Sequence, residues 1–83
     1  MYVNPPYGRD VGRWVAKART TAASGVTVVM LLPARTDTRW FHADVYGVAE
    51  IRFLKGRLRF RLRGLSLHPA PFPSMVVVFR ALP

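Results

Sequence analysis

The run Val26-Thr27-Val28-Val29-Met30-Leu31-Leu32 decides the fold of this chain. It is apolar at every position except Thr27, and its first half is β-branched. Such a continuous run is typical of a strand that is buried on both faces, in a parallel sheet flanked by helices. Pro33 ends the strand, because proline has no backbone N–H for the ladder. The sequence therefore predicts a strand over residues 26–32 within an α/β fold.

A helix is predicted directly before this strand, over residues 10–24. One helical face collects its apolar side chains, namely Val11, Trp14, Val15, Ala18 and Ala22. Asp10 is a suitable N-cap residue and Gly25 a suitable stop. Residues 1–4 have the character of a strand end, so the chain is expected to begin with a strand-helix-strand crossover.

The second half of the chain indicates shorter elements and an antiparallel ending. A short helix is expected over residues 36–46, with N-cap residue types at its start and Gly47 as its breaker. Residues 49–54 and 57–62 are strand-like, and the turn signal Lys55-Gly56 between them predicts a hairpin-like pair. An irregular stretch over residues 64–74 precedes a last strand over residues 75–79. The predicted fold class is α/β, with two parallel strands and helices followed by an antiparallel strand pair.

The tetrapeptide Asn4-Pro5-Pro6-Tyr7 follows the first strand. An exocyclic amino group of a nucleobase is a poor nucleophile, because its lone pair is delocalised into the ring. Two acceptors that hold both amino hydrogens would aim that lone pair at an electrophile, and the Asn4 side-chain oxygen and the Pro5 carbonyl are such acceptors. The prolines fix the direction of the carbonyls, and Tyr7 offers a face for an extruded base. A simple turn is the alternative interpretation.

This tetrapeptide and the loop at residues 33–38 both follow predicted strands. Ligands in open α/β sheets bind beyond the carboxyl ends of the strands. The two loops are therefore expected to lie at the same edge of the sheet.

Composition narrows the classes of partner. The chain has 83 residues, enough for at most one small domain, and a hydrophobic content of 51% that favours folding. Its net charge of +9 favours an anionic partner, with nucleic acid as the default. The absence of cysteine excludes a disulfide framework and a thiol nucleophile, and His42 and His68 are too isolated to predict a metal site. No apolar run is long enough to span a membrane and no signal peptide is apparent, so a cytoplasmic location is expected.

Basic residues cluster in the second half of the chain. The cluster consists of Arg52, Lys55, Arg57, Arg59, Arg61 and Arg63. Where basic and apolar residues alternate, the arginines are expected on one strand face. Such a face suits phosphate contacts, which set affinity and register without reading sequence. The alternative is a solvated edge whose charges deter aggregation.

Several strings along the chain closely resemble the carboxyl-terminal half of the phage-type DNA adenine-N6 methyltransferases, the Dam-like family. The resemblance covers nearly the whole chain and rests on Asn4-Pro5-Pro6-Tyr7-Gly8, Trp14, Lys17, residues 28–38, Trp40-Phe41-His42, Glu50-Ile51-Arg52-Phe53, residues 56–60 and Ala70-Pro71-Phe72-Pro73-Ser74. It implies a partial Rossmann-like methyltransferase sheet and methylation of adenine in DNA with S-adenosylmethionine as cofactor.

The resemblance also implies roles for individual residues. Asn4, Pro5, Pro6 and Tyr7 would be catalytic, with Asn4 and Pro5 also at the rim of the cofactor site. Arg35 would contact phosphate or base, although a structural pair with Asp37 is equally compatible. The aromatic residues Trp40, Phe41 and Phe72 are expected mainly to pack.

The sequence departs from the family pattern where the cofactor site is expected. The glycine-rich turn and the acidic residue that hold S-adenosylmethionine in such enzymes do not precede Asn4. Residues 1–83 are therefore expected to be a single domain, the truncated catalytic half of a methyltransferase. In the family strand order, the strand before Asn4 pairs with the first strand of the sheet, so here it would be an exposed edge. Such edges invite pairing, and we expect a homodimer or a missing amino-terminal half as partner.

Two other interpretations remain open at this point. The chain could be a non-catalytic basic DNA-binding remnant that keeps the fold and charge of the family but no cofactor site. A basic amphipathic protein acting on anionic membranes is the weaker alternative, because the buried-type strand at residues 26–32 favours a packed core.

Overall fold

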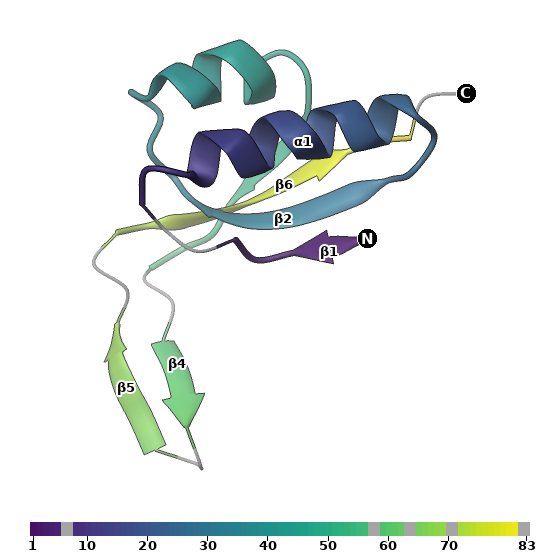
Figure 1. Ribbon diagram of the computed structural model, residues 1–83. Helices are drawn as coiled ribbons and strands as arrows, with labels where there is room; N and C mark the ends of the chain where they lie inside the picture. The colour runs from purple at the N-terminus through teal and green to yellow at the C-terminus, as the bar shows by residue number, and fades with distance from the viewer. Residues whose placement is uncertain (6–7, 57–58, 63–64, 70–71, 82–83) are drawn as a thin grey trace.

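A mixed four-stranded sheet with strand order β1-β2-β6-β3 forms the body of the protein, which is described by a computed structural model (Figure 1). The structure describes residues 1–5, 8–56, 59–62, 65–69 and 72–81. The strands of this sheet are β1 (Tyr2–Val3), β2 (Val28–Pro33), β3 (Glu50–Phe53) and β6 (Ser74–Phe79). β1 pairs with β2 in parallel, and β6 pairs with both β2 and β3 in antiparallel fashion. The expected parallel pair is confirmed, in a small α/β sheet.

Two helical segments cover one face of this sheet. α1 (Val11–Ala23) confirms the helix predicted over residues 10–24, and it buries Val11, Val15, Ala18 and Ala22 against the strands. Trp14, which was predicted on the same face, is exposed instead. The second segment is η1 (Phe41–Val45), a turn of π-helix within the predicted short helix. Figure 1 shows both segments on the same side of the sheet.

Only one face of β2 is fully buried, which corrects the expectation of burial on both. Val28, Met30 and Leu32 point to the helices and are buried, whereas Val29 and Leu31 are only half-buried. β6 follows the same alternation across the ladder, where Val28, Met30 and Leu32 lie opposite Phe79, Val77 and Met75. The apolar run is therefore continuous although helices cover only one of its two faces. Its second face is apolar, yet no described helix covers it.

The hairpin expected between residues 49–54 and 57–62 is wrong. β3 pairs with β6 instead, and β4 (Arg59–Leu62) pairs with β5 (Leu65–Pro69) in a separate two-stranded sheet. β5 lies within the stretch that was expected to be irregular. The physical reason is that Ile51 packs against the core, which requires β3 in the main sheet. The chain then leaves the sheet after Leu54, whose N–H bonds the carbonyl oxygen of Ser74 at 3.0 Å.

A close approach fixes α1 against the segment that leads into η1. A Cβ atom added at Gly12 would lie 3.2 Å from Cβ of Trp40, so glycine permits this contact. Asp10 occupies the predicted N-cap position, but its side chain makes no capping hydrogen bond. The first turn of α1 is therefore aligned with Trp40 by packing alone.

An exposed ion pair joins β3 to the end of β6. Arg80 donates two hydrogen bonds to the carboxylate of Glu50, at 3.1 and 3.0 Å. These hydrogen bonds lower the pKa of Glu50 below its ordinary value. Within the described part of the chain, no helix is long and apolar enough to cross a membrane.

The one-sided burial of β2 predicts unequal effects for two neighbouring leucines. Leu32→Ala removes a fully buried side chain and is expected to lower the free energy of unfolding by about 2–5 kcal/mol. Leu31→Ala acts on the half-buried face of the same strand and should cost about 1 kcal/mol. Urea unfolding followed by circular dichroism measures both. Equal losses would show that the second face of the sheet is covered in solution.

Candidate functional site

The carboxyl ends of β1 and β2 meet at one edge of the sheet, which we call the carboxyl edge. It consists of residues 4–5 and 8–10 around the start of α1, residues 33–38 after β2, residues 53–55 after β3 and residues 72–74 before β6. The β4–β5 hairpin leaves the body at this same edge (Figure 1). The expectation that the loops after β1 and β2 share an edge is confirmed.

Asn4 and Pro5 directly follow β1 at this edge. Asn4 is exposed and Pro5 is buried, so the start of the loop is anchored while the carboxamide reaches solvent. The Asn4 side chain makes no hydrogen bond to any residue that the structure describes, and its oxygen is available as an acceptor. The other two residues of the tetrapeptide, Pro6 and Tyr7, lie outside the described residues.

The loop at residues 34–38 is held by a dense set of hydrogen bonds. Its first residue, Ala34, donates its N–H to the carbonyl of Pro73 at 2.8 Å, which ties the loop to the segment before β6. The Thr38 hydroxyl donates to the carbonyl of Arg35 at 2.7 Å. His42 of η1 places Nε2 2.7 Å from the carbonyl oxygen of Thr36. These hydrogen bonds fix the conformation of the loop, which forms one side of the carboxyl edge.

Arg35 packs against an aromatic ring rather than pairing with Asp37. Its guanidinium carbon lies 5.2 Å from the ring centroid of Phe72, a cation–π distance. Among the described residues no ion pair joins Arg35 and Asp37. Phe72 is 8% exposed, so its expected packing role is confirmed. Trp40 and Phe41 are also core residues, the first partly and the second fully buried.

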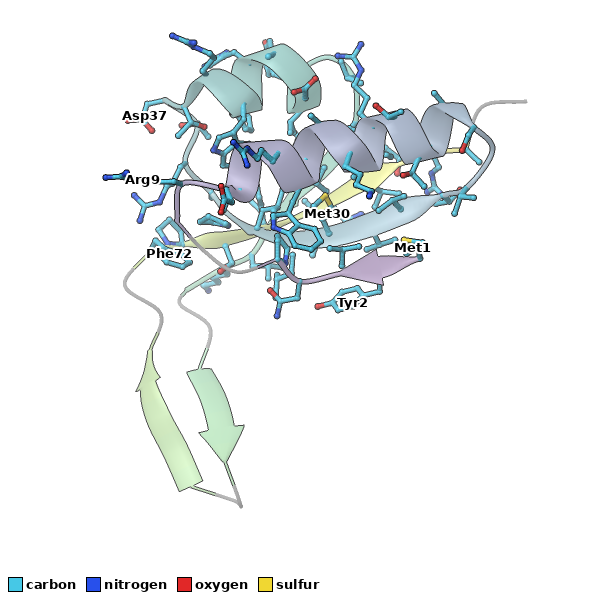
Figure 2. All side chains as sticks on the ribbon, viewed as in Figure 1. Met1, Tyr2, Arg9, Met30, Asp37 and Phe72 are labelled. Carbon is cyan, nitrogen blue, oxygen red and sulfur yellow. The ribbon has the colours of Figure 1, made fainter. Side chains whose placement is uncertain are left out.

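A pocket of about 390 Å³ opens at the carboxyl edge, between the start of α1 and the loop after β2. The described residues that line it are Gly8, Arg9, Val11, Pro33, Arg35 and Trp40. Figure 2 shows Arg9 and Phe72 at this end of the sheet, with Asp37 nearby. Sequence reasoning missed Arg9. Its position directly after the Asn4-to-Gly8 string is a signal that could have found it.

The other predicted basic residues lie around the same edge. Arg52 on β3 and Lys55 just after it are exposed. Arg59 and Arg61 belong to β4, so their backbone lies in the hairpin. Arg57 and Arg63 fall outside the described residues. The structure thus connects the hairpin arginines and the Asn4 loop to one edge of the sheet.

Acidic residues do little to neutralise this edge. Arg13 pairs with Asp10 at 4.0 Å, Arg19 with Asp44 at 3.2 Å and Arg80 with Glu50 at 3.0 Å. Arg9, Arg35, Arg52 and Lys55 form no ion pair with any described residue. In the part of the chain that the structure covers, no group of three or more His, Cys, Asp or Glu residues could hold a metal ion. The edge is therefore a positively charged surface.

Comparison with known proteins identifies the family. The family model described as DNA N-6-adenine-methyltransferase (Dam) matches residues 1–82, nearly the whole chain. No curated protein and no solved structure gives a significant match. The family match includes the Asn4 loop and the loop after β2, and so agrees with the resemblance carried by those strings. The chain belongs to the DNA N-6-adenine-methyltransferase (Dam) family.

Proposed function

We propose that this chain forms the target-base and DNA-binding part of an enzyme that methylates the exocyclic amino group of adenine in DNA with S-adenosylmethionine. The observation that supports this most directly is the position of Asn4 and Pro5. They lie at the carboxyl edge, beside a shaped loop and at the root of a basic hairpin. A base held there would sit beside uncompensated positive charge, where its own phosphodiester backbone is attracted.

The Asn4 loop would orient the target amino group. The Asn4 carboxamide oxygen and the Pro5 carbonyl would accept its two hydrogens, which leaves the nitrogen lone pair directed toward the incoming methyl. Buried Pro5 would keep the second acceptor in place. By the family resemblance, Pro6 would fix the direction of the loop and Tyr7 would stack on the extruded adenine.

The described residues do not by themselves fit the methyl donor. S-adenosylmethionine carries a sulfonium and an ammonium charge and ribose hydroxyls, which call for carboxylate or carbonyl acceptors. The lining of the pocket at the carboxyl edge instead includes two arginines, Arg9 and Arg35. Asn4 and Pro5 would therefore form only the rim of the donor site. A non-catalytic DNA-binding chain is the second candidate function, and this lack of fit favours it.

Two substitutions of Asn4 separate orientation of the amino group from folding. Asn4→Ala removes the side-chain acceptor, and transfer of labelled methyl from S-adenosylmethionine to unmethylated duplex DNA should fall about 100-fold or more. Asn4→Asp keeps an acceptor oxygen at the same place and should retain measurable transfer. Asn4 is exposed, so both variants should fold alike.

The outcomes of this assay discriminate between the two candidate functions. Transfer that disappears only in Asn4→Ala supports the methyltransferase. Equal transfer by the native chain and Asn4→Ala contradicts the role of Asn4. DNA binding without any transfer by the native chain supports the non-catalytic alternative.

The β4–β5 hairpin would add contacts to the DNA backbone. A two-stranded ribbon has dimensions that the major groove admits, and the hairpin extends away from the sheet at the edge that holds Asn4 (Figure 1). We infer that its arginines contact phosphates, together with Arg52 and Lys55. Such contacts set affinity and register rather than sequence preference.

The salt dependence of DNA binding tests the hairpin arginines. In the variant Arg57→Gln/Arg59→Gln/Arg61→Gln, the slope of log affinity against log salt should fall by about three, since each phosphate contact contributes about one unit. The control is Lys17→Gln/Arg19→Gln/Arg80→Gln, which removes the same charge on α1 and at the end of β6. An equal fall in both variants would mean that only net charge matters.

The β1 edge supports a proposal about assembly. β1 is the edge strand of the sheet, and Tyr2 on it is 65% exposed. We infer that this edge pairs with another chain, either a second copy or an amino-terminal half of the enzyme. Pairing of unprotected edges is a general tendency of sheets.

Light scattering over a range of concentrations tests pairing with a second copy. The mass should rise above 9.4 kDa as concentration increases. Tyr2→Lys places a charge on the edge strand and should weaken association. Tyr46→Lys is the matched control, because Tyr46 is 67% exposed but lies after η1. A constant monomeric mass would contradict pairing with a second copy of the chain.

A further inference from the structure

We propose that Arg9 and Arg35 together hold one phosphate that flanks the extruded adenine. This inference rests on the proposed function, since it takes DNA as the ligand and Asn4 as the residue that holds the base. It assigns to Arg9 a role in the site and gives the pocket at the carboxyl edge an anionic occupant.

The pocket has the size and the lining for a charged group of this kind. Its volume is about 390 Å³, and two of its lining residues are arginines, Arg9 in the turn before α1 and Arg35 in the loop after β2. Gly8 turns the chain directly before Arg9 with a φ of +134°, a conformation that favours glycine. No heavy atom lies within 4 Å of the position that a Cβ of Gly8 would occupy, so the approach is open.

Both guanidinium groups retain their full charge. Neither forms an ion pair with a described residue, and the nearby acidic residue Asp10 pairs with Arg13 instead. Asp37 lies at the same end of the molecule but does not line the pocket (Figure 2). A planar guanidinium binds phosphate oxygens through two parallel hydrogen bonds. Two arginines that line one pocket supply enough donors for the oxygens of a single phosphodiester.

One of the two arginines is held in place before any ligand binds. Arg35 packs on the Phe72 ring at 5.2 Å, and its carbonyl accepts a 2.7 Å hydrogen bond from the Thr38 hydroxyl. Such ordering reduces the entropy that binding must offset. The first turn of α1 adds to the field, because it contains no acidic residue and its N-cap side chain bonds no backbone N–H.

The chemistry of the pocket favours a phosphodiester over the carboxylate of the methyl donor. The donor's carboxylate sits next to an ammonium group, which two arginines repel, and no described residue of the lining offers a carboxylate for it. A nucleotide held by Asn4 instead carries phosphates on both sides of its sugar. The pocket begins at Gly8, four residues further along the same loop.

A double-mutant cycle between protein and DNA tests this assignment. The probe is a fluorescent duplex with one mismatched adenine, which is extruded more readily than a paired base. In a second duplex, neutral methylphosphonates replace the two phosphates that flank this adenine, and in a third they lie near the duplex end. Affinities are measured by anisotropy for the native chain, for Arg9→Gln/Arg35→Gln and for Arg13→Gln/Lys17→Gln. The last pair removes equal charge from exposed positions of α1 outside the pocket.

The native chain should lose about tenfold in affinity when the flanking phosphates are neutral, as expected for charged hydrogen bonds. Arg9→Gln/Arg35→Gln should bind the unmodified duplex about tenfold more weakly and should not respond to the flanking methylphosphonates. Arg13→Gln/Lys17→Gln should still show the full loss. Methylphosphonates near the duplex end should affect all three proteins equally.

The assay separates failure of this inference from failure of the proposed function. If the flanking methylphosphonates weaken Arg9→Gln/Arg35→Gln as much as the native chain, the phosphate site is wrong. If Arg9→Gln/Arg35→Gln does not respond to the flanking methylphosphonates but a duplex with a mismatched thymine binds as tightly as one with adenine, the phosphate site is supported. The same result contradicts a function directed at adenine. If the native chain binds none of the duplexes, both the phosphate site and the proposed function are contradicted. Donor binding that is lost in Arg9→Gln/Arg35→Gln without DNA would assign the pocket to the donor's carboxylate instead.

Discussion

The antiparallel ladder between β2 and β6 is the constraint on which the rest of the structure depends. It joins residues 28–33 to residues 74–79, and its inward positions carry Met30, Leu32, Met75 and Val77, all fully buried. The other elements of the body are placed relative to this ladder: β1 along one side, β3 along the other, and α1 and η1 across one face. A short chain has little surface to bury, so a single well-packed ladder must do most of the positioning. The loops of the candidate site inherit their geometry from it, because they leave the sheet where the ladder ends at Pro33 and Ser74.

The elements that sequence reasoning predicted well are those with a clear local period. The α1 face of Val11, Val15, Ala18 and Ala22 and the apolar run of β2 are such signals, and both elements appear within two residues or so of their expected bounds. Strand pairing was less predictable, because it depends on partners far apart in the chain. Residues 49–54 were predicted to pair with residues 57–62. They pair instead with the second side of β6, where Ile51 packs against the core. β5 was missed because its apolar positions are interrupted by Ser66 and His68 and lie between two stretches rich in turn residues.

In the candidate site, too, some features could be predicted from sequence and others could not. The carboxamide of Asn4 and the basic residues could be found from residue type and position, and the shared edge followed from strand direction alone. Arg9 directly follows the Asn4-to-Gly8 string, but its place in the lining of a pocket is visible only in the folded chain. Arg35 was predicted from its place in the loop after β2, but its packing on Phe72 was not, because the two residues lie far apart in sequence. Side chains that act through a local motif are readable in sequence, whereas pairs that meet across a fold are not.

The separation of the β4–β5 hairpin from the main sheet has a consequence for how such proteins diversify. A two-stranded ribbon draws little stability from its own pairing, and the helices and the four-stranded sheet form their core from other segments (Figure 1). The sequence of the hairpin can therefore change without altering the strand pairing of the four-stranded sheet. Lineages that share this body would then be expected to differ most in the hairpin, while the four-stranded sheet and its helices stay alike.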